Sequence, residues 1–299
     1  MWQPPWHDAV KSVRPNSSVQ QAIADANLGV FSVRDSKPGK RELLCEHPES
    51  PASARSLGLI RSNHVPLQNN EAFALFQPLV DSGCLSIDSA CDWKGGWRVW
   101  MVFRILKYET AADLDHLRPF LLFGHDPFTN YFKLSYLLVR AATNGILTEG
   151  TYHNPGPSIP PHDHLPRRFS SGHEKACEEI QDHLSGVIST FRRMNRLPIS
   201  PHEADGYLLE VARRTQKFRR SGLSDGQVNQ LHAECKERLS RRDVSVHDKQ
   251  TTLWTAYTTV IEWIDRESAT LHGWERLKEL WSSSIKDDAL YVALQIIGT

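Results

Sequence analysis

The sequence predicts an α+β fold, with an antiparallel sheet and a packed helix in the N-terminal half and a mostly helical C-terminal half. Residues 84–91 alternate between apolar and polar side chains, which is typical of a strand with one buried face, and further strand candidates follow up to residue 139. From Glu174 onward, the apolar residues recur at helical spacing. Because strands and helices occupy separate parts of the chain, the pattern favours α+β over an alternating α/β arrangement.

The elements expected before residue 84 are short. Residues 19–27 predict an amphipathic helix and residues 29–33 a strand. Residues 34–56 hold Pro, Gly and Ser among scattered charges and are interpreted as a loop or a hairpin. Residues 57–60 predict a strand, and apolar side chains at helical spacing predict a helix over 70–81.

A β-hairpin over residues 84–106 is the clearest local prediction. Its strands are expected at 84–91 and 97–106, around a Lys-Gly-Gly turn at 94–96, because glycine tolerates the positive φ of tight turns. Strand candidates at 118–123 and 131–139 follow.

The rest of the chain completes the expected organisation into three regions. Residues 1–148 form the region of the sheet, 149–172 a linker or loop rich in Pro and His, and 173–299 a helical region. Helices are expected near 173–193, 201–220, 224–240, 247–270 and 272–286.

Composition narrows the class of protein. The chain has 35 Lys and Arg against 35 Asp and Glu, so binding of a polyanion requires an uneven placement of charge. Five cysteines without a CxxC pair argue against a disulfide framework and an all-cysteine zinc site. Neither a signal peptide nor an apolar run of 18 residues is visible, so a cytoplasmic protein without a membrane partner is expected.

His125 and Asp126 form the first candidate site. They occupy a tight loop between two strands, and Arg140 and Asn144 lie at the end of the next strand. These side chains could form a general base with an orienting carboxylate, a phosphate-binding corner, or a turn closed by its own hydrogen bonds. The catalytic candidates are thus His125, Asp126 and Asn144.

A nucleic-acid surface is the second candidate. Arg98 and Arg104 flank Trp100 on one face of the hairpin, and Arg beside exposed aromatic rings is typical of single-strand binders. Trp97 lies on the opposite face, and one of the two faces must be core. Basic residues near helix ends could add phosphate contacts or simply suit the helix dipole. The predicted nucleic-acid-binding residues are Arg98, Trp100, Arg104, Arg140, Arg213, Arg214, Lys217, Arg219 and Arg220.

Metal and cofactor signals are weak. His162 and His164 are the candidate metal ligands, but they lie in a Pro-rich segment and fit no common zinc spacing. The sequence contains no P-loop, GxGxxG, HExxH or GxSxG motif, so no cofactor is expected and the balance leans away from an enzyme.

Five segments in register resemble one family. They are residues 64–73 (HVPLQNNEAF), 95–100 (GGWRVW), 122–126 (LFGHD), 139–145 (VRAATNG) and 252–257 (TLWTAY). Together they resemble the phage- and plasmid-borne domain-of-unknown-function family 932. Phe123 and Gly124 depart from the Asn-Ser that the family carries before its His-Asp pair.

The resemblance implies a setting rather than an activity: phages, plasmids and other mobile elements. We therefore expect an accessory protein of a mobile element that binds nucleic acid, handling or annealing single-stranded DNA in recombination. One alternative is a protein-interaction module that inhibits a host defence system through a host protein partner. A second is a phosphodiesterase or nuclease. The Trp-rich C-terminal helices indicate core packing in the first place and, as an alternative, the interface of a homo-oligomer.

Overall fold

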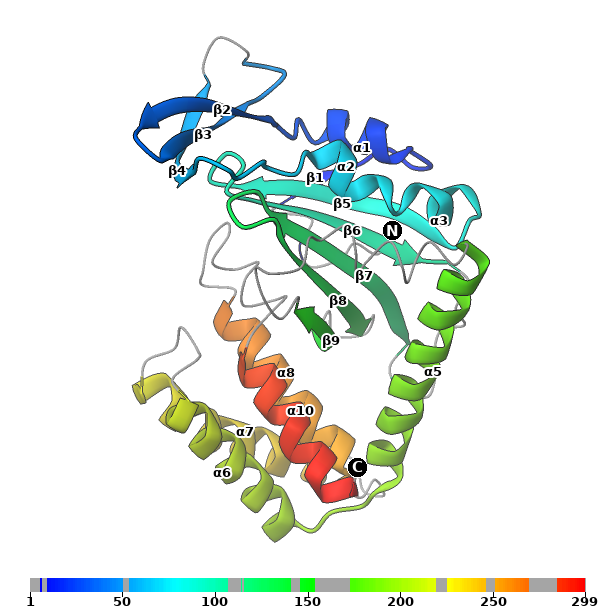
Figure 1. Cartoon of the computed structure of the whole chain (residues 1–299). Coiled ribbons are helices and arrows are strands. Elements are labelled where there is room, and N and C mark those ends of the chain that lie inside the picture. Colours follow the sequence, from blue (N-terminus) through cyan, green and yellow to red (C-terminus); the bar gives the residue numbers. More distant parts are fainter. Residues whose placement is uncertain are drawn as a thin grey trace.

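The computed structural model describes residues 6, 10–50, 54–106, 114, 116–140, 146–153, 173–218, 225–245, 251–268 and 284–298. It confirms the α+β class, with two antiparallel sheets in the N-terminal half and long helices in the C-terminal half. Figure 1 shows the larger sheet in the middle of the molecule, between short helices above and the long helices below.

The larger sheet has six antiparallel strands in the order β1-β5-β6-β7-β8-β9. Strands β5 to β9 follow one another along the chain, so each connection joins neighbours. The strands are β1 (Lys11–Ser12), β5 (Leu85–Trp93), β6 (Arg98–Ile105), β7 (Leu117–Asp126), β8 (Tyr131–Arg140) and β9 (Ile146–His153).

Strand β9 corrects the predicted boundary of the Pro/His-rich segment. The linker or loop was expected to begin at residue 149, but β9 continues to His153 and pairs with β8. The physical reason is that the prolines, which exclude a central strand, begin only at Pro155. Residues 154–172 lie outside the described part of the chain.

The smaller sheet resolves the open interpretation of residues 34–56 in favour of a hairpin. Its order is β2-β3-β4, and Gly39 adopts a positive φ of 73° in the turn between β2 and β3. The strands are β2 (Val30–Lys37), β3 (Lys40–Glu46) and β4 (Arg55–Arg61). In Figure 1 this sheet extends beyond one end of the larger sheet, above the turns of its hairpins.

Both faces of the larger sheet are covered. Val99, Met101 and Phe103 of β6 belong to the main core, whereas the alternate residues Trp100 and Val102 belong to a second, smaller core cluster. This alternation follows from the two-residue period of a strand.

Three short helices pack on the main-core face: α1 (Val19–Asp25), α2 (Asn69–Ala74) and α3 (Gln77–Asp81). The prediction of one continuous helix over 70–81 is therefore wrong, because α2 and α3 are two separate helices. Pro78 stands in the first turn of α3, where its missing N–H is tolerated, and it breaks the helix before that point.

The helical half comprises α5 (His173–Arg196), α6 (Pro201–Phe218), α7 (Asp225–Ser245), α8 (Leu253–Ser268) and α10 (Ser284–Ile297). The expected helix at 272–286 lies largely outside the described residues, and α10 begins at its end. The main core cluster contains side chains from both halves of the chain. For example, His183 of α5 stacks on Tyr136 of β8 with ring centroids 4.3 Å apart. Among the described helices, none is long and apolar enough to cross a membrane.

Candidate nucleic-acid interface

The segment 64–70 is tied by hydrogen bonds to the turn between β7 and β8. Nε2 of His64 lies 2.7 Å from the Pro127 carbonyl. Asn130 accepts from the Leu67 N–H (2.9 Å) and donates to the Val65 carbonyl (2.8 Å). Side chains therefore satisfy backbone groups that no strand or helix pairs.

The same segment also binds the smaller sheet. The Gln68 side chain both accepts from the N–H of Phe31 (2.9 Å) and donates to its carbonyl (2.8 Å). Asn69 donates to the Gly29 carbonyl over 2.6 Å, so its side-chain oxygen is left to accept a bond from Nε2 of His125, 2.7 Å away. Residues 64–70, which carry much of the family resemblance, thus connect the smaller sheet, strand β7 and the β7–β8 turn.

His125 is a buried structural side chain. It is 2% exposed, and Phe31 and Phe73 meet its ring edge-on at centroid distances of 6.0 and 5.7 Å. Burial lowers its pKa to about 3, so the ring is neutral. Nε2 carries the proton that Asn69 accepts, and Nδ1 has no hydrogen-bond partner among the described residues. A group so enclosed cannot touch a substrate, so its assignment as a general base is corrected.

Asp126 closes the turn, as one of the alternatives proposed. Its carboxylate accepts from the N–H of Phe128 over 2.8 Å. Burial raises its pKa, and the bond from Phe128 and the charge of Arg98 partly offset that rise. Asn144, the third catalytic candidate, lies outside the described residues.

Gly124 has a steric reason to be glycine. The indole ring of Trp100 lies over it, and a Cβ at this position would come 2.1 Å from Cε3 of Trp100. Trp100 is 6% exposed and packs in the second core cluster with Trp6. The prediction that Trp100 offers a stacking surface is therefore wrong, because its ring covers the sheet.

Two predicted phosphate contacts are occupied by carboxylates. Arg140 is 5% exposed, and its Nη1 lies 2.7 Å from Glu262 of α8. Arg104 lies 3.1 Å from the buried Asp88. Arg140 is enclosed and cannot contact a nucleic acid, so its prediction as a binding residue is wrong. Arg104 remains half exposed, but its charge is neutralised by Asp88.

Two of the predicted basic residues near the end of α6 have described side chains, and both are paired with carboxylates. Arg213 pairs with Glu210 over 2.8 Å. Arg214 pairs with Asp288 over 3.0 Å and lies 3.8 Å above the ring of Tyr291. Lys217 belongs to α6, but its side chain is not described, and Arg219 and Arg220 lie outside the described residues.

Three aromatic rings meet where the β5–β6 and β7–β8 hairpins turn. Trp93 and Trp97 flank the first turn with ring centroids 6.2 Å apart and planes at 81°. The centroid of Trp97 lies 4.9 Å from that of Phe128 in the second turn. Trp97 is 41% exposed, and the other two rings are half-buried. An aromatic edge thus faces solvent at this end of the sheet.

Cations surround this aromatic edge. Nζ of Lys94 lies 4.6 Å from the centroid of Trp93. The guanidinium of Arg55, at the start of β4, lies against Gly95, where a Cβ would be 2.9 Å from Nη1. Arg98 pairs in register with Trp93. All three cations are exposed, and none forms an ion pair with a described residue. We call Arg55, Trp93, Lys94, Trp97, Arg98 and Phe128 the hairpin-end surface.

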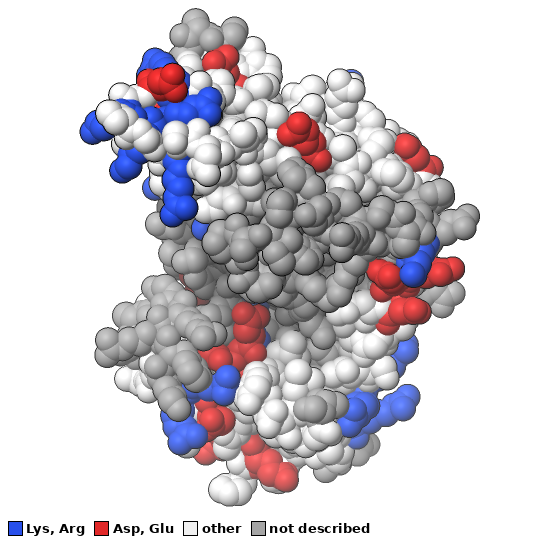
Figure 2. All heavy atoms as spheres, in the orientation of Figure 1, with Lys and Arg blue, Asp and Glu red and all other residues white. Residues whose placement is uncertain are grey.

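Positive charge continues over the smaller sheet. Strands β2, β3 and β4 carry six basic and three acidic side chains. Figure 2 shows Lys and Arg atoms gathered over this end of the molecule, at its upper left. The uneven placement that a neutral chain requires for binding a polyanion is therefore present here.

The sequence could indicate part of this surface. Trp93 and Trp97 stand on either side of the Lys-Gly-Gly turn in the sequence, so two aromatic rings near the turn could be expected. Of the residues of the hairpin-end surface, however, only Arg98 was among the predicted binding residues. Arg55 and Phe128 could not be found in this way, because β4 and the β7–β8 turn bring them in from distant parts of the chain.

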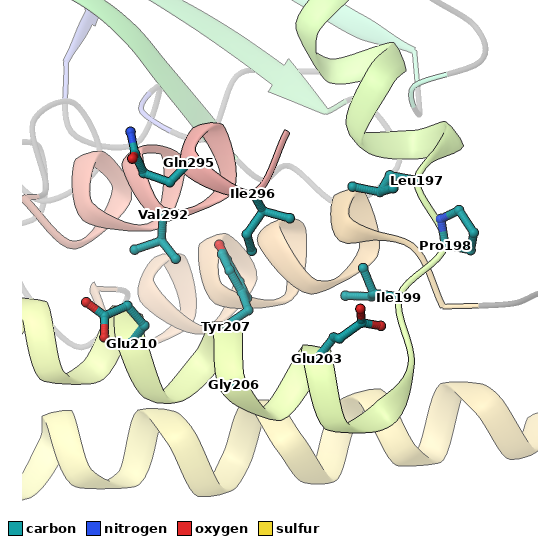
Figure 3. A pocket seen from close by; sticks show the side chains of 10 residues that line it. All are labelled: Leu197, Pro198, Ile199, Glu203, Gly206, Tyr207, Glu210, Val292, Gln295 and Ile296. Atoms are coloured by element: carbon teal, nitrogen blue, oxygen red, sulfur yellow. The ribbon is translucent and has the colours of Figure 1, made fainter. Parts of the chain in front are cut away.

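A groove between α6 and α10 is a separate feature. It encloses about 640 Å³. Figure 3 shows Tyr207 between the two helices, Val292 and Ile296 on α10, and Glu203 and Glu210 on α6. Apolar side chains thus lie beside carboxylates.

Within the described ranges, no group of three His, Cys, Asp or Glu side chains could hold a metal ion. The weak candidates His162 and His164 lie outside those ranges.

The comparisons with known proteins identify a family without an assigned activity. A family model described as "Domain of unknown function (DUF932)" matches residues 56–281 of the 299. No curated protein and no solved structure matches the chain.

Proposed function

Because the chain belongs to the DUF932 family, whose function is unassigned, we propose from its own surface that it binds single-stranded nucleic acid at the hairpin-end surface. The observation that carries the proposal is the exposed aromatic edge of Trp93, Trp97 and Phe128 with cations on its rim. Bases of any sequence can stack on such rings, and the cations attract the phosphates.

The shape of the surface favours single strands over a duplex. Bases in a duplex are stacked on one another, so they offer their faces to a protein side chain only after they unstack. In a single strand the faces are accessible, and Trp97 presents its ring at the tip of a turn. Arg55 and Arg98 lie at the same end, where they can reach the backbone on either side of a stacked base.

The test is fluorescence anisotropy with labelled oligo-dT and with a duplex of equal length, across a salt series. Trp97→Ala should weaken single-strand binding by about 5- to 150-fold, which corresponds to the 1–3 kcal/mol of one base stack. Tyr291→Ala is the matched control, because Tyr291 is 45% exposed and Trp97 is 41% exposed. Wild-type protein that binds no oligonucleotide at low salt would overturn the proposal.

The mobile-element setting stays a prediction that rests on the resemblance. It agrees with handling of single-stranded DNA but does not follow from the surface. The phosphodiesterase alternative loses its main support, because His125 is enclosed.

The groove between α6 and α10 favours a second candidate, binding of a protein partner. Ile296 is 45% exposed and lines the groove beside Val292 and Tyr207. This apolar lining suits an apolar side chain of a partner. If the wild-type protein captures a protein partner at a stoichiometric level, Ile296→Glu should abolish that capture. Lys236→Glu on α7, outside the groove, should leave it unchanged. Unchanged capture by Ile296→Glu would remove the groove from consideration.

A further inference from the structure

Three cations stand in one row across the smaller sheet. Lys37 of β2 pairs in register with Lys40 of β3, and Lys40 pairs with Arg61 of β4. All three side chains are exposed, and none makes an ion pair with a described residue. We call Lys37, Lys40 and Arg61 the cation row.

The nearby acids are already used by other cations. Glu42 lies 2.5 Å from Arg34, and Asp35 lies 3.6 Å from Arg41. The smaller sheet therefore pairs its neighbouring charges and leaves the cation row unpaired.

Like charges directly opposite on neighbouring strands destabilise a sheet. Lysines on edge strands do protect against pairing with other chains, but Lys40 lies on β3, the middle strand, where it protects no edge. The repulsion within the row is relieved when an anion with several charges lies along it. A phosphate backbone is such an anion, because it repeats its charge at short intervals.

We propose that the cation row is a second phosphate contact for the same strand that stacks at the hairpin-end surface, an inference that rests on the proposed function. Strand β4 carries Arg55 at one end and Arg61 at the other. Because the pairing of β3 with β4 shifts between Leu43 and Leu44, Arg55 lies on the face of Cys45 and Arg61 on the opposite face with Lys40, so the ligand would have to pass around the edge of β4. Six residue steps at about 3.3 Å separate the two arginines by roughly 20 Å. The ligand is thus a single strand long enough to cover both ends of β4, not a nucleotide or a very short oligonucleotide.

The test compares the salt dependence of binding in three proteins: the wild type, the row variant (Lys37→Gln, Lys40→Gln, Arg61→Gln), and a control with the same charge change on α5 and α7 (Lys175→Gln, Lys236→Gln, Arg241→Gln). Each cation that contacts a single strand contributes about 0.7 to the slope of log K against log salt, so the row variant should lose roughly 2 from that slope. The control should lose nothing.

Oligo-dT length gives an independent measurement. A strand of about 16 nucleotides should distinguish wild type from the row variant, whereas one of about 4 nucleotides, which fills one end only, should not. Thermal unfolding should show that the row variant is at least as stable as wild type, because the repulsion is gone. Lys40→Gln alone, the middle cation, serves if the triple variant does not fold.

The outcomes separate the two proposals. Wild-type binding that depends on Trp97, together with an unchanged salt slope in the row variant, overturns the cation row and leaves the hairpin-end surface standing. No single-strand binding by wild type overturns both. Binding of anionic vesicles that depends on the row, without binding of oligonucleotides, would also overturn both and assign the row to a lipid surface.

Discussion

Acid should loosen the attachment of the smaller sheet through one side chain, His125. The ring lies between Asn69, which accepts its only described hydrogen bond, and the edges of Phe31 and Phe73. A second proton would have to sit on Nδ1, which has no partner among the described residues. Protonation therefore places an unpaired charge in the core, and the fold resists it.

The magnitude follows from the difference in pKa between the two states. The pKa of His125 is about 3 in the fold, where burial lowers it from an ordinary value of 6.5. Because the folded pKa is the lower one, the neutral ring stabilises the fold fully above pH 6.5. That contribution is lost as the pH falls from 6.5 toward 3. The slope is about 1.4 kcal/mol per pH unit, so about 2 kcal/mol is lost between pH 7 and pH 5.

Urea unfolding at pH 7 and at pH 5 measures this loss. His125→Gln keeps an N–H for Asn69 and cannot gain a proton, so the variant should lose about 2 kcal/mol less than wild type over this interval. His202→Gln on the exposed surface of α6 is the control and should behave as wild type. A wild-type and a His125→Gln protein whose stabilities change equally with pH would refute the reasoning.

Three further substitutions or reagents test other parts of the fold. Gly124→Ala should cost about 1–3 kcal/mol in urea unfolding, because the Cβ meets the ring of Trp100; a cost below about 0.5 kcal/mol would contradict that contact. Arg140→Ala should cost about 3–5 kcal/mol because it breaks the buried ion pair with Glu262, and adding Glu262→Gln should recover part of that cost; if the double variant is no more stable than Arg140→Ala, the pair is not coupled. Burial and the nearby Asp92 raise the pKa of Cys45 to about 12, so iodoacetamide should label it in urea but not in the native protein, as measured by mass spectrometry; rapid native labelling would show that the thiol is accessible.

The strand and helix pattern was predictable because local periodicity carries it. The β5–β6 hairpin around Gly95 and Gly96 is confirmed, since the alternation and the glycines are both local signals. The break at Pro78 was also encoded in the sequence, yet the helical spacing across it outweighed the proline in the prediction.

The burial of both faces of the hairpin was not predictable, because distant residues decide it. Trp100 lies within β6, whereas Trp97 lies in the turn that precedes Arg98, the first residue of that strand. Trp6, far away in the sequence, covers the face of Trp100, and the main core covers the opposite face, so Trp97 stays 41% exposed because it stands in the turn. The cation row likewise depends on the register of three strands, including irregular pairing between Asp35 and Lys37, which spacing alone does not define.

The shared core and the pair of Arg140 with Glu262 have a consequence for how this chain can be divided. The two partners of that pair are 122 residues apart, on opposite sides of the segment 154–172. Producing the parts before and after that segment as two separate chains would separate these partners and divide the main core cluster, which holds side chains from both halves. Each part produced alone would then lack this ion pair and a share of the main core, so neither part is expected to be as stable as the intact chain.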